Sequence, residues 1–77
     1  MNKVLFFAHL RDAVGAEFLK IDASGKTVAE LKADLAAIYN LPKMDTVMTA
    51  VNEEFALNDD IIQDGDEIAF IPPVSGG

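Results

Sequence analysis

The 77-residue sequence contains no cysteine and a single histidine, His9. Without cysteine the chain has no disulfide framework, no thiolate metal site and no thiol nucleophile. One histidine also excludes zinc sites that need two or three imidazole ligands. The reactive group of the chain, if it has one, must therefore be of another kind.

Basic residues and long apolar runs are also scarce. All six basic residues lie in residues 1–43 beside five acidic ones, whereas residues 44–77 hold eight acidic residues and no basic one, for a net charge of −7. Such a surface repels phosphate backbones, so we expect no nucleic-acid partner. The acidic half either steers association with a basic protein or serves solubility alone.

The apolar run near the start of the chain, residues 4–8, is far shorter than a membrane span. It is also too short for the core of a signal peptide followed by a cleavage site. We therefore expect a cytoplasmic protein with no membrane partner.

Side chains that would form a self-contained active site are few. Ser24 and Ser75 are the only serines, and His9 is the only candidate base. A serine–histidine–carboxylate set needs mutual hydrogen-bond contact, which nothing in this spacing predicts. We expect His9 to be a partly exposed residue at the end of a strand, and we expect no active site formed by the chain alone.

The clearest local signal is a helix start. Thr27 and Glu30 have the spacing of a capping box, in which each side chain accepts a hydrogen bond from the other residue's backbone amide. The apolar residues that follow at helical spacing predict a buried stripe, from which Lys32 and Asp34 are excluded: Val28, Leu31, Leu35 and Ile38. Asn40 and Pro42 are expected to end this helix.

The remaining segments alternate between strands and turns. Apolar and β-branched residues predict strands at 3–8, 17–21, 46–51, 55–57 and 67–71. Residues 10–14 form a short helical turn closed by Gly15, and residues 52–54 and 63–66 form turns.

This order of elements predicts an α+β fold in which one main helix covers a mixed sheet. Ubiquitin-like β-grasp proteins have this arrangement, although the order alone leaves other small α+β folds open. We expect residues 1–71 to form a single domain and residues 72–77 to form an extended, flexible C-terminal tail.

The tail itself suggests a function. Residues 68–77 carry no charged side chain, and the chain ends on Gly76 and Gly77 after the pair Pro72 and Pro73. The prolines hold the backbone extended, and glycines without Cβ atoms can enter a channel too narrow for side chains. The Gly77 carboxylate becomes an electrophile once another protein converts it to an acyl-adenylate with ATP. The pattern thus indicates a carrier whose reactive group is its own C-terminus.

Four segments carry a family resemblance: residues 4–8 (VLFFA), 10–12 (LRD), 50–52 (AVN) and 64–77 (DGDEIAFIPPVSGG). Together they resemble the molybdopterin synthase small subunits, which are ubiquitin-like sulfur carriers. The resemblance extends along the whole chain and is most specific in the last of these segments.

The resemblance implies a reaction cycle. An adenylyltransferase similar to ubiquitin-activating enzymes activates Gly77 with ATP, and a sulfur donor protein converts the terminus to a thiocarboxylate. The carrier then gives its sulfur to precursor Z, cyclic pyranopterin monophosphate, inside the large subunit. The implied assembly is a heterotetramer of two small and two large chains. The chain itself would bind no cofactor and no metal, and catalytic side chains would belong to the large subunit.

The resemblance also assigns residues. Gly77 is the residue that is modified. The residues assigned to partner binding are Gly76, Ser75, Val74, Pro73, Pro72, Ile71, Phe7 and Arg11. Phe7 corresponds to an aromatic at the family's interface, although burial in the core would explain it as well.

Three other functions stay open. A thiamine-pathway sulfur carrier has a similar fold and the same terminal glycine pair, although the Pro72–Pro73–Val74 segment favours a molybdopterin synthase subunit. A ubiquitin-like protein modifier would form conjugates with lysines. A passive β-grasp binding module would use the tail only for docking.

Overall fold

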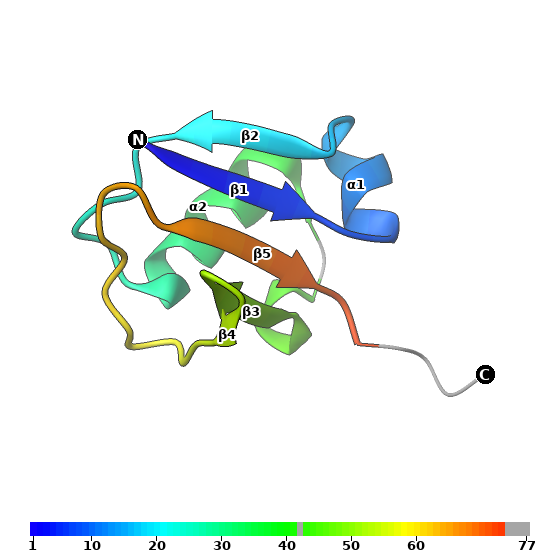
Figure 1. Cartoon of the computed structure of the whole chain (residues 1–77). Helices are drawn as coiled ribbons and strands as arrows, with labels where there is room; N and C mark the ends of the chain where they lie inside the picture. Colours follow the sequence, from blue (N-terminus) through cyan, green and yellow to red (C-terminus); the bar gives the residue numbers. More distant parts are fainter. Residues whose placement is uncertain (42, 74–77) are drawn as a thin grey trace.

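Five strands form one mixed sheet in the order β2-β1-β5-β3-β4 (Figure 1). The computed structural model describes residues 1–41 and 43–73. The strands are β1 (Asn2–Phe6), β2 (Phe18–Ile21), β3 (Met48–Val51), β4 (Glu54–Phe55) and β5 (Glu67–Ile71). β1 and β5 run parallel at the centre, and the other three pairings are antiparallel.

Three helical segments connect the strands: α1 (His9–Val14), α2 (Val28–Tyr39) and the 3₁₀ turn η1 (Met44–Thr46). In Figure 1, α2 lies across one face of the sheet and no described helix covers the other face. The predicted α+β fold with one main helix is confirmed. No helix within residues 1–41 and 43–73 is long and apolar enough to cross a membrane.

The predicted start of α2 is confirmed. The Glu30 amide donates to Thr27 Oγ1 at 3.1 Å, and the Thr27 amide donates to Glu30 Oε1 at 2.8 Å. The helix ends at Asn40, which adopts a left-handed conformation at φ 55°. Pro42, the second expected stop, lies outside the described residues.

The core lies between α2 and the facing side of the central strands. Phe6 and Phe70 are fully buried, with ring centroids 6.2 Å apart. Val28, Leu31 and Leu35 of the predicted stripe pack against this layer. Burial of each side chain of this size stabilises the folded state by roughly 1.5–3 kcal/mol.

The prediction was wrong at Ile38 and Lys32. Ile38 is 69% exposed, because the chain reverses at Asn40 and brings Leu41 into the core instead. Lys32 is only 8% exposed, because it lies one turn from Val28 on the same helix face.

The boundaries of four strands also differ from the prediction, by one residue at the starts of β1, β2 and β4 and by two residues at the ends of β1 and β4 and at the start of β3. β1 ends at Phe6 rather than at residue 8, because Ala8 has a φ of 54° that extended strands do not adopt. β3 begins at Met48 rather than at residue 46, because residues 44–46 form η1 with Met44 buried. Glu54, expected in a turn, is paired with Val51 in the sheet.

The buried Lys32 ties α2 to two other segments. Its ammonium donates to the Val47 carbonyl at 2.8 Å and to Asn58 Oδ1 at 3.2 Å. Burial lowers the pKa of Lys32 below the ordinary value of 10.5, against the opposing effect of Asp45. The charged amine thus holds η1 and the loop at Asn58 in place at a desolvation cost.

This lowered pKa predicts how stability changes with pH. Between the folded and unfolded pKa values the folded chain binds fewer protons, so stability rises with pH in that interval. We expect the free energy of unfolding of the wild type, minus that of Lys32→Met, to increase as pH rises toward 10.5. Urea titrations over this range measure it, with exposed Lys20→Met as the matched control. A difference independent of pH would contradict the prediction.

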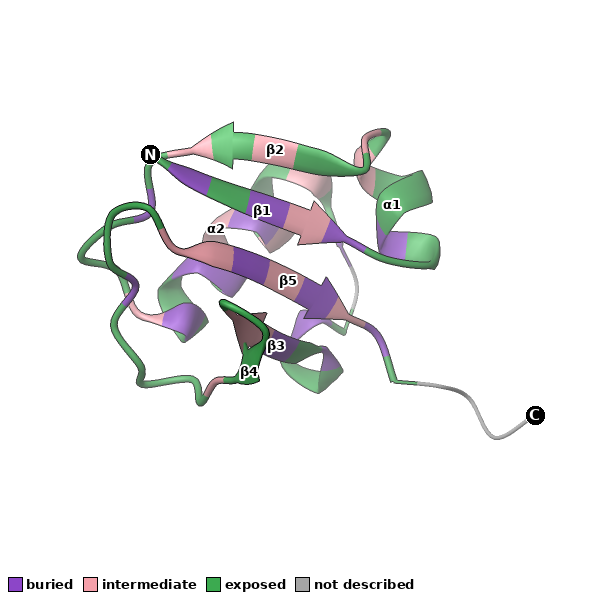
Figure 2. Ribbon diagram, viewed as in Figure 1, coloured by how far each residue is buried: buried purple, intermediate pink, exposed green. Residues whose placement is uncertain are grey.

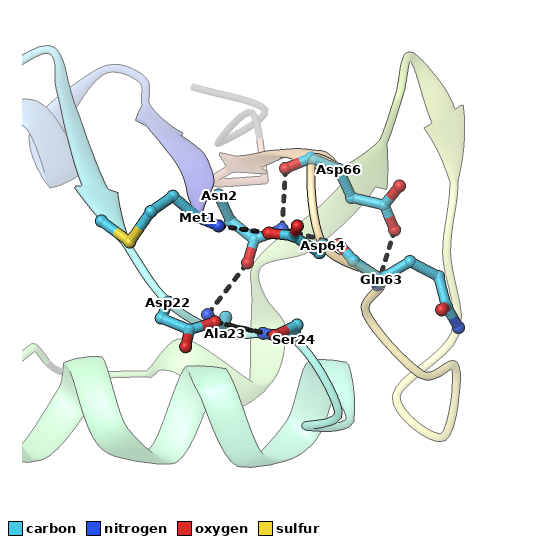
Figure 3. Close-up of polar contacts among 8 residues, drawn as sticks. All are labelled: Met1, Asn2, Asp22, Ala23, Ser24, Gln63, Asp64 and Asp66. Carbon is cyan, nitrogen blue, oxygen red and sulfur yellow. Dashed lines mark hydrogen bonds and ion pairs between the residues drawn. The ribbon is translucent and has the colours of Figure 1, made fainter.

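Asn2 joins the first strand to two loops (Figure 3). Its Nδ2 donates to the Gln63 carbonyl at 2.8 Å and to the Asp66 carbonyl at 3.0 Å, and its Oδ1 accepts from the Ala23 amide at 2.9 Å. Asn2 is 2% exposed. Next to it the Met1 amine pairs with the Asp64 carboxylate.

Removing this amide is expected to destabilise the whole domain. Asn2→Ala leaves the Ala23 amide and two carbonyls without their partner, which should cost about 2–4 kcal/mol. Chemical denaturation measures the loss, with Ser24→Ala as a control because the Ser24 hydroxyl bonds Asp22 on an exposed surface. If Asn2→Ala lowers the free energy of unfolding no more than Ser24→Ala does, the three hydrogen bonds of the Asn2 side chain are not structurally important.

Candidate functional site

The parallel pairing of β1 and β5 sets the position of the site. Phe6 is paired with Phe70, so Phe7 and Ile71 follow at the carboxyl ends of the two strands, on the same edge of the sheet. The chain leaves β5 at this edge toward Pro72 and Pro73 (Figure 1). Pro72 is buried and Pro73 is exposed.

The face of the sheet opposite α2, here called the outer face, carries alternate residues of each strand. Figure 2 shows buried residues of β1 and β5 alternating with less buried ones. The strand register aligns one row across all five strands in the order Phe18, Leu5, Ala69, Ala50 and Phe55. The two small alanines are thus flanked by larger apolar side chains.

The small alanines at the centre of this row leave a groove with a volume of about 340 Å³. It is lined by Leu5, Phe7, Ala50, Glu53, Phe55, Glu67, Ala69 and Ile71. Phe7 is 40% exposed and Phe55 is 79% exposed. Water-exposed aromatics around an apolar groove, with acidic groups at one end, are typical of a protein-binding surface.

The structure brings together some of the sequence-assigned residues. Phe7 and Ile71 line the same groove, and Phe7 is not a core residue. Arg11 is exposed on α1, where it lines a different hollow and lies 3.8 Å from Glu17. Residues 74–77, which include Gly76 and Gly77, lie outside the described residues.

His9 is exposed, as expected, but it begins α1 rather than ending a strand. Among residues 1–41 and 43–73 no carboxylate pairs with its side chain, whereas a catalytic histidine is oriented by such a partner.

The groove residues of β3 and β4 were missed by the sequence reasoning. Residues 4–7 form an unbroken apolar run, which was compatible with burial on both faces. The sequence does contain a signal for this face, because one main helix can cover only one face of the sheet. Every second apolar residue of a central strand must therefore lie on the face that the helix leaves uncovered. Assigning Ala50 and Phe55 to that face also requires the register.

A family model described as the ThiS family matches residues 4–77. The chain belongs to the ThiS family. It is 41% identical to the molybdopterin synthase sulfur carrier subunit of Escherichia coli K12, over the full length of both chains. It is 36% identical to the Arabidopsis thaliana protein of the same name, with coverage of 97% of this chain and 81% of that protein.

Solved structures agree with this ThiS-family membership. A putative molybdopterin converting factor subunit 1 from Pyrococcus furiosus superposes with a TM-score of 0.81 at 26% identity, covering 95% of this chain and 97% of that one. Small archaeal modifier protein 1 from Methanosarcina acetivorans gives 0.79 at 28% identity, covering 99% and 95%. A complex of subunits 1 and 2 of the molybdopterin-converting factor from Helicobacter pylori contains a chain that gives 0.69 at 27% identity, covering 99% and 97%.

Proposed function

We propose that the chain is the sulfur carrier subunit of a molybdopterin synthase. The observation that carries this proposal is the 41% identity over the full length of a relative with that name. The strand that leads to the terminal glycines ends at the rim of an exposed apolar groove, which fits a carrier that docks and presents its end. The Arabidopsis relative shares the name, which favours this function over the thiamine-pathway carrier.

The proposed chemistry takes place at Gly77. An adenylyltransferase transfers AMP from ATP to the terminal carboxylate with loss of pyrophosphate. Sulfur at the oxidation level of sulfide, delivered by a sulfur donor protein, then displaces AMP, which leaves a thiocarboxylate at Gly77. Transfer of that sulfur to precursor Z, with water supplying the oxygen that replaces it, returns the carboxylate. Two such transfers supply the two sulfurs of the molybdopterin dithiolene. The chain acts as a co-substrate that loses its sulfur in each transfer and is then loaded again. The catalytic side chains belong to its partner.

The proposed partner is the large subunit of the synthase, in a heterotetramer of two small and two large chains. The complex of two molybdopterin-converting factor subunits from Helicobacter pylori supports a partner of this kind. We assign the outer-face groove to this contact, with Phe7 and Ile71 at its edge. Pro73 and the residues that follow would then enter the partner's active site. Buried Pro72 would act as an anchor for the exit from β5 rather than as a contact.

Reconstitution tests this function. The purified chain is incubated with a sulfur-carrier adenylyltransferase, ATP and a sulfur donor protein, and its intact mass is measured. We expect a gain equal to the difference between a sulfur and an oxygen atom, located at Gly77 by fragmentation. Adding the large subunit and precursor Z should return the original mass and yield molybdopterin. A chain that gains no mass, although the E. coli carrier does in the same mixture, would overturn the proposal.

A second function, protein modification, is favoured by one observation. The small archaeal modifier protein 1 of Methanosarcina acetivorans superposes at a TM-score of 0.79. An activated Gly77 would then form an isopeptide bond with a lysine of another protein. Searching cell extracts for peptides that carry the Gly76–Gly77 remnant on lysine distinguishes this function, since a dedicated sulfur carrier leaves none.

A further inference from the structure

The outer face has a charge pattern that its groove alone does not explain. Lys3 and Lys20 are a cross-strand pair at one end of β1 and β2, and both are exposed. Lys3 lies on the outer face, since its ammonium is 4.5 Å from the centre of the Phe18 ring. Lys3 is also paired with Glu67 of β5, and Glu67 and Glu53 line the same end of the groove. One end of the outer face is thus basic on the β2 side and acidic on the β3 side.

We propose that this face binds a second copy of the chain, face to face, about a two-fold axis that runs along the strands between β1 and β5. Rotation about such an axis keeps each row level and reverses the order of the strands. β1 then lies opposite β5 of the second copy, and β2 lies opposite its β3. The basic pair of each copy meets the acidic pair of the other, with Lys3 opposite Glu67 and Lys20 beside Glu53.

The apolar row is self-complementary under the same rotation. Phe18 of one copy lies opposite Ala50 of the other, and Leu5 lies opposite Ala69. Large side chains therefore enter the groove above the small ones, as packing between two sheets requires. The same alignment also keeps the lysines of one copy away from the lysines of the other.

The size of the face predicts a weak dimer. β4 has no counterpart under this rotation, and the four strands that overlap are four or five residues long. At about 4.8 Å between strands they present roughly 300 Å² on each copy. Two such faces fall below the roughly 1,200 Å² of stable complexes, so association is reversible. The dimer uses the outer face alone and does not depend on sulfur transfer. If the proposed function holds as well, the second copy and the large subunit compete for one surface.

Charge variants of the full chain test the dimer. Sedimentation velocity from about 10 µM to about 1 mM should show the wild type shifting from monomer toward dimer. Lys3→Glu/Lys20→Glu and Glu53→Lys/Glu67→Lys should each remain monomeric when alone, because like charges then face each other. An equimolar mixture of the two variants should associate again, at least as tightly as the wild type. Circular dichroism establishes that each variant is folded.

The controls separate this dimer from other contacts. Phe18→Ser should weaken association about tenfold or more, because it removes the side chain that enters the groove. Ile38→Ser, at an exposed apolar residue on α2, should leave association unchanged. A wild type that remains monomeric at the highest concentration, a mixture that does not associate, or association lost through Ile38→Ser would each overturn the proposal. None of these measurements involves the terminus, so failure here leaves the sulfur-carrier function standing.

Discussion

Deleting Gly77 is expected to abolish sulfur transfer while leaving the fold and partner binding intact. The deletion moves the terminal carboxylate back by about 3.5 Å along the chain. A misplacement of about 1 Å already costs on the order of 100-fold in rate, so the loss should exceed that factor. Molybdopterin formation in the reconstituted system, measured against the wild type, gives the result. Adding one alanine after Gly77 should have the same effect, because the added side chain blocks the channel.

Ser75→Ala is the matched control for both tail variants, because it removes a hydroxyl group without moving the carboxylate. It should retain most of the activity. Binding of the deleted chain to the large subunit should change little, since the outer face is untouched. If the chain without Gly77 still supports molybdopterin formation, it is a passive binding module and not a carrier.

Ala69→Arg is expected to abolish binding to the large subunit. Ala69 lies at the centre of the outer face, and its Cβ is directed away from the core. An arginine there fills the groove and buries an unpaired charge against the partner, which should cost about 3–5 kcal/mol, on the order of 100-fold or more in Kd. Isothermal titration calorimetry with the purified large subunit measures the loss.

The fold should survive this substitution, because Ala69 is on the open side of β5 and its neighbours Ile68 and Phe70 hold the core. Ile38→Arg, on the opposite side of the molecule from the groove, is the control and should bind like the wild type. Equal losses at both positions would show that the effect is one of overall charge. Unchanged binding of Ala69→Arg would remove the outer face from the interface.

The local signals in the sequence predicted the elements well. The Thr27 and Glu30 capping box fixed the start of α2, and Glu67–Ile71 was predicted with its bounds as found. Both signals act within a few residues, so no knowledge of the rest of the chain is needed to interpret them.

What the sequence could not reveal depends on contacts between distant segments. Lys32 shares the buried face of α2 with Val28, but the partners that accept hydrogen bonds from its ammonium there, the Val47 carbonyl and Asn58, are far from it in the sequence. The groove exists because the register aligns Leu5, Ala69 and Ala50 across three strands. Periodicity indicates which residues share a face of one strand, but the alignment between strands arises only in the folded sheet.

The chemical state of the terminus tests the account most directly. The protein is purified from its own cells without reducing or acidic steps, and its intact mass is followed by fragmentation of the C-terminal peptide. We expect part of the population to carry one sulfur in place of one oxygen at Gly77, and this fraction to disappear when the adenylyltransferase gene is deleted. A terminus that is always a plain carboxylate, in cells that are making molybdopterin, would contradict the claim that this chain carries the sulfur.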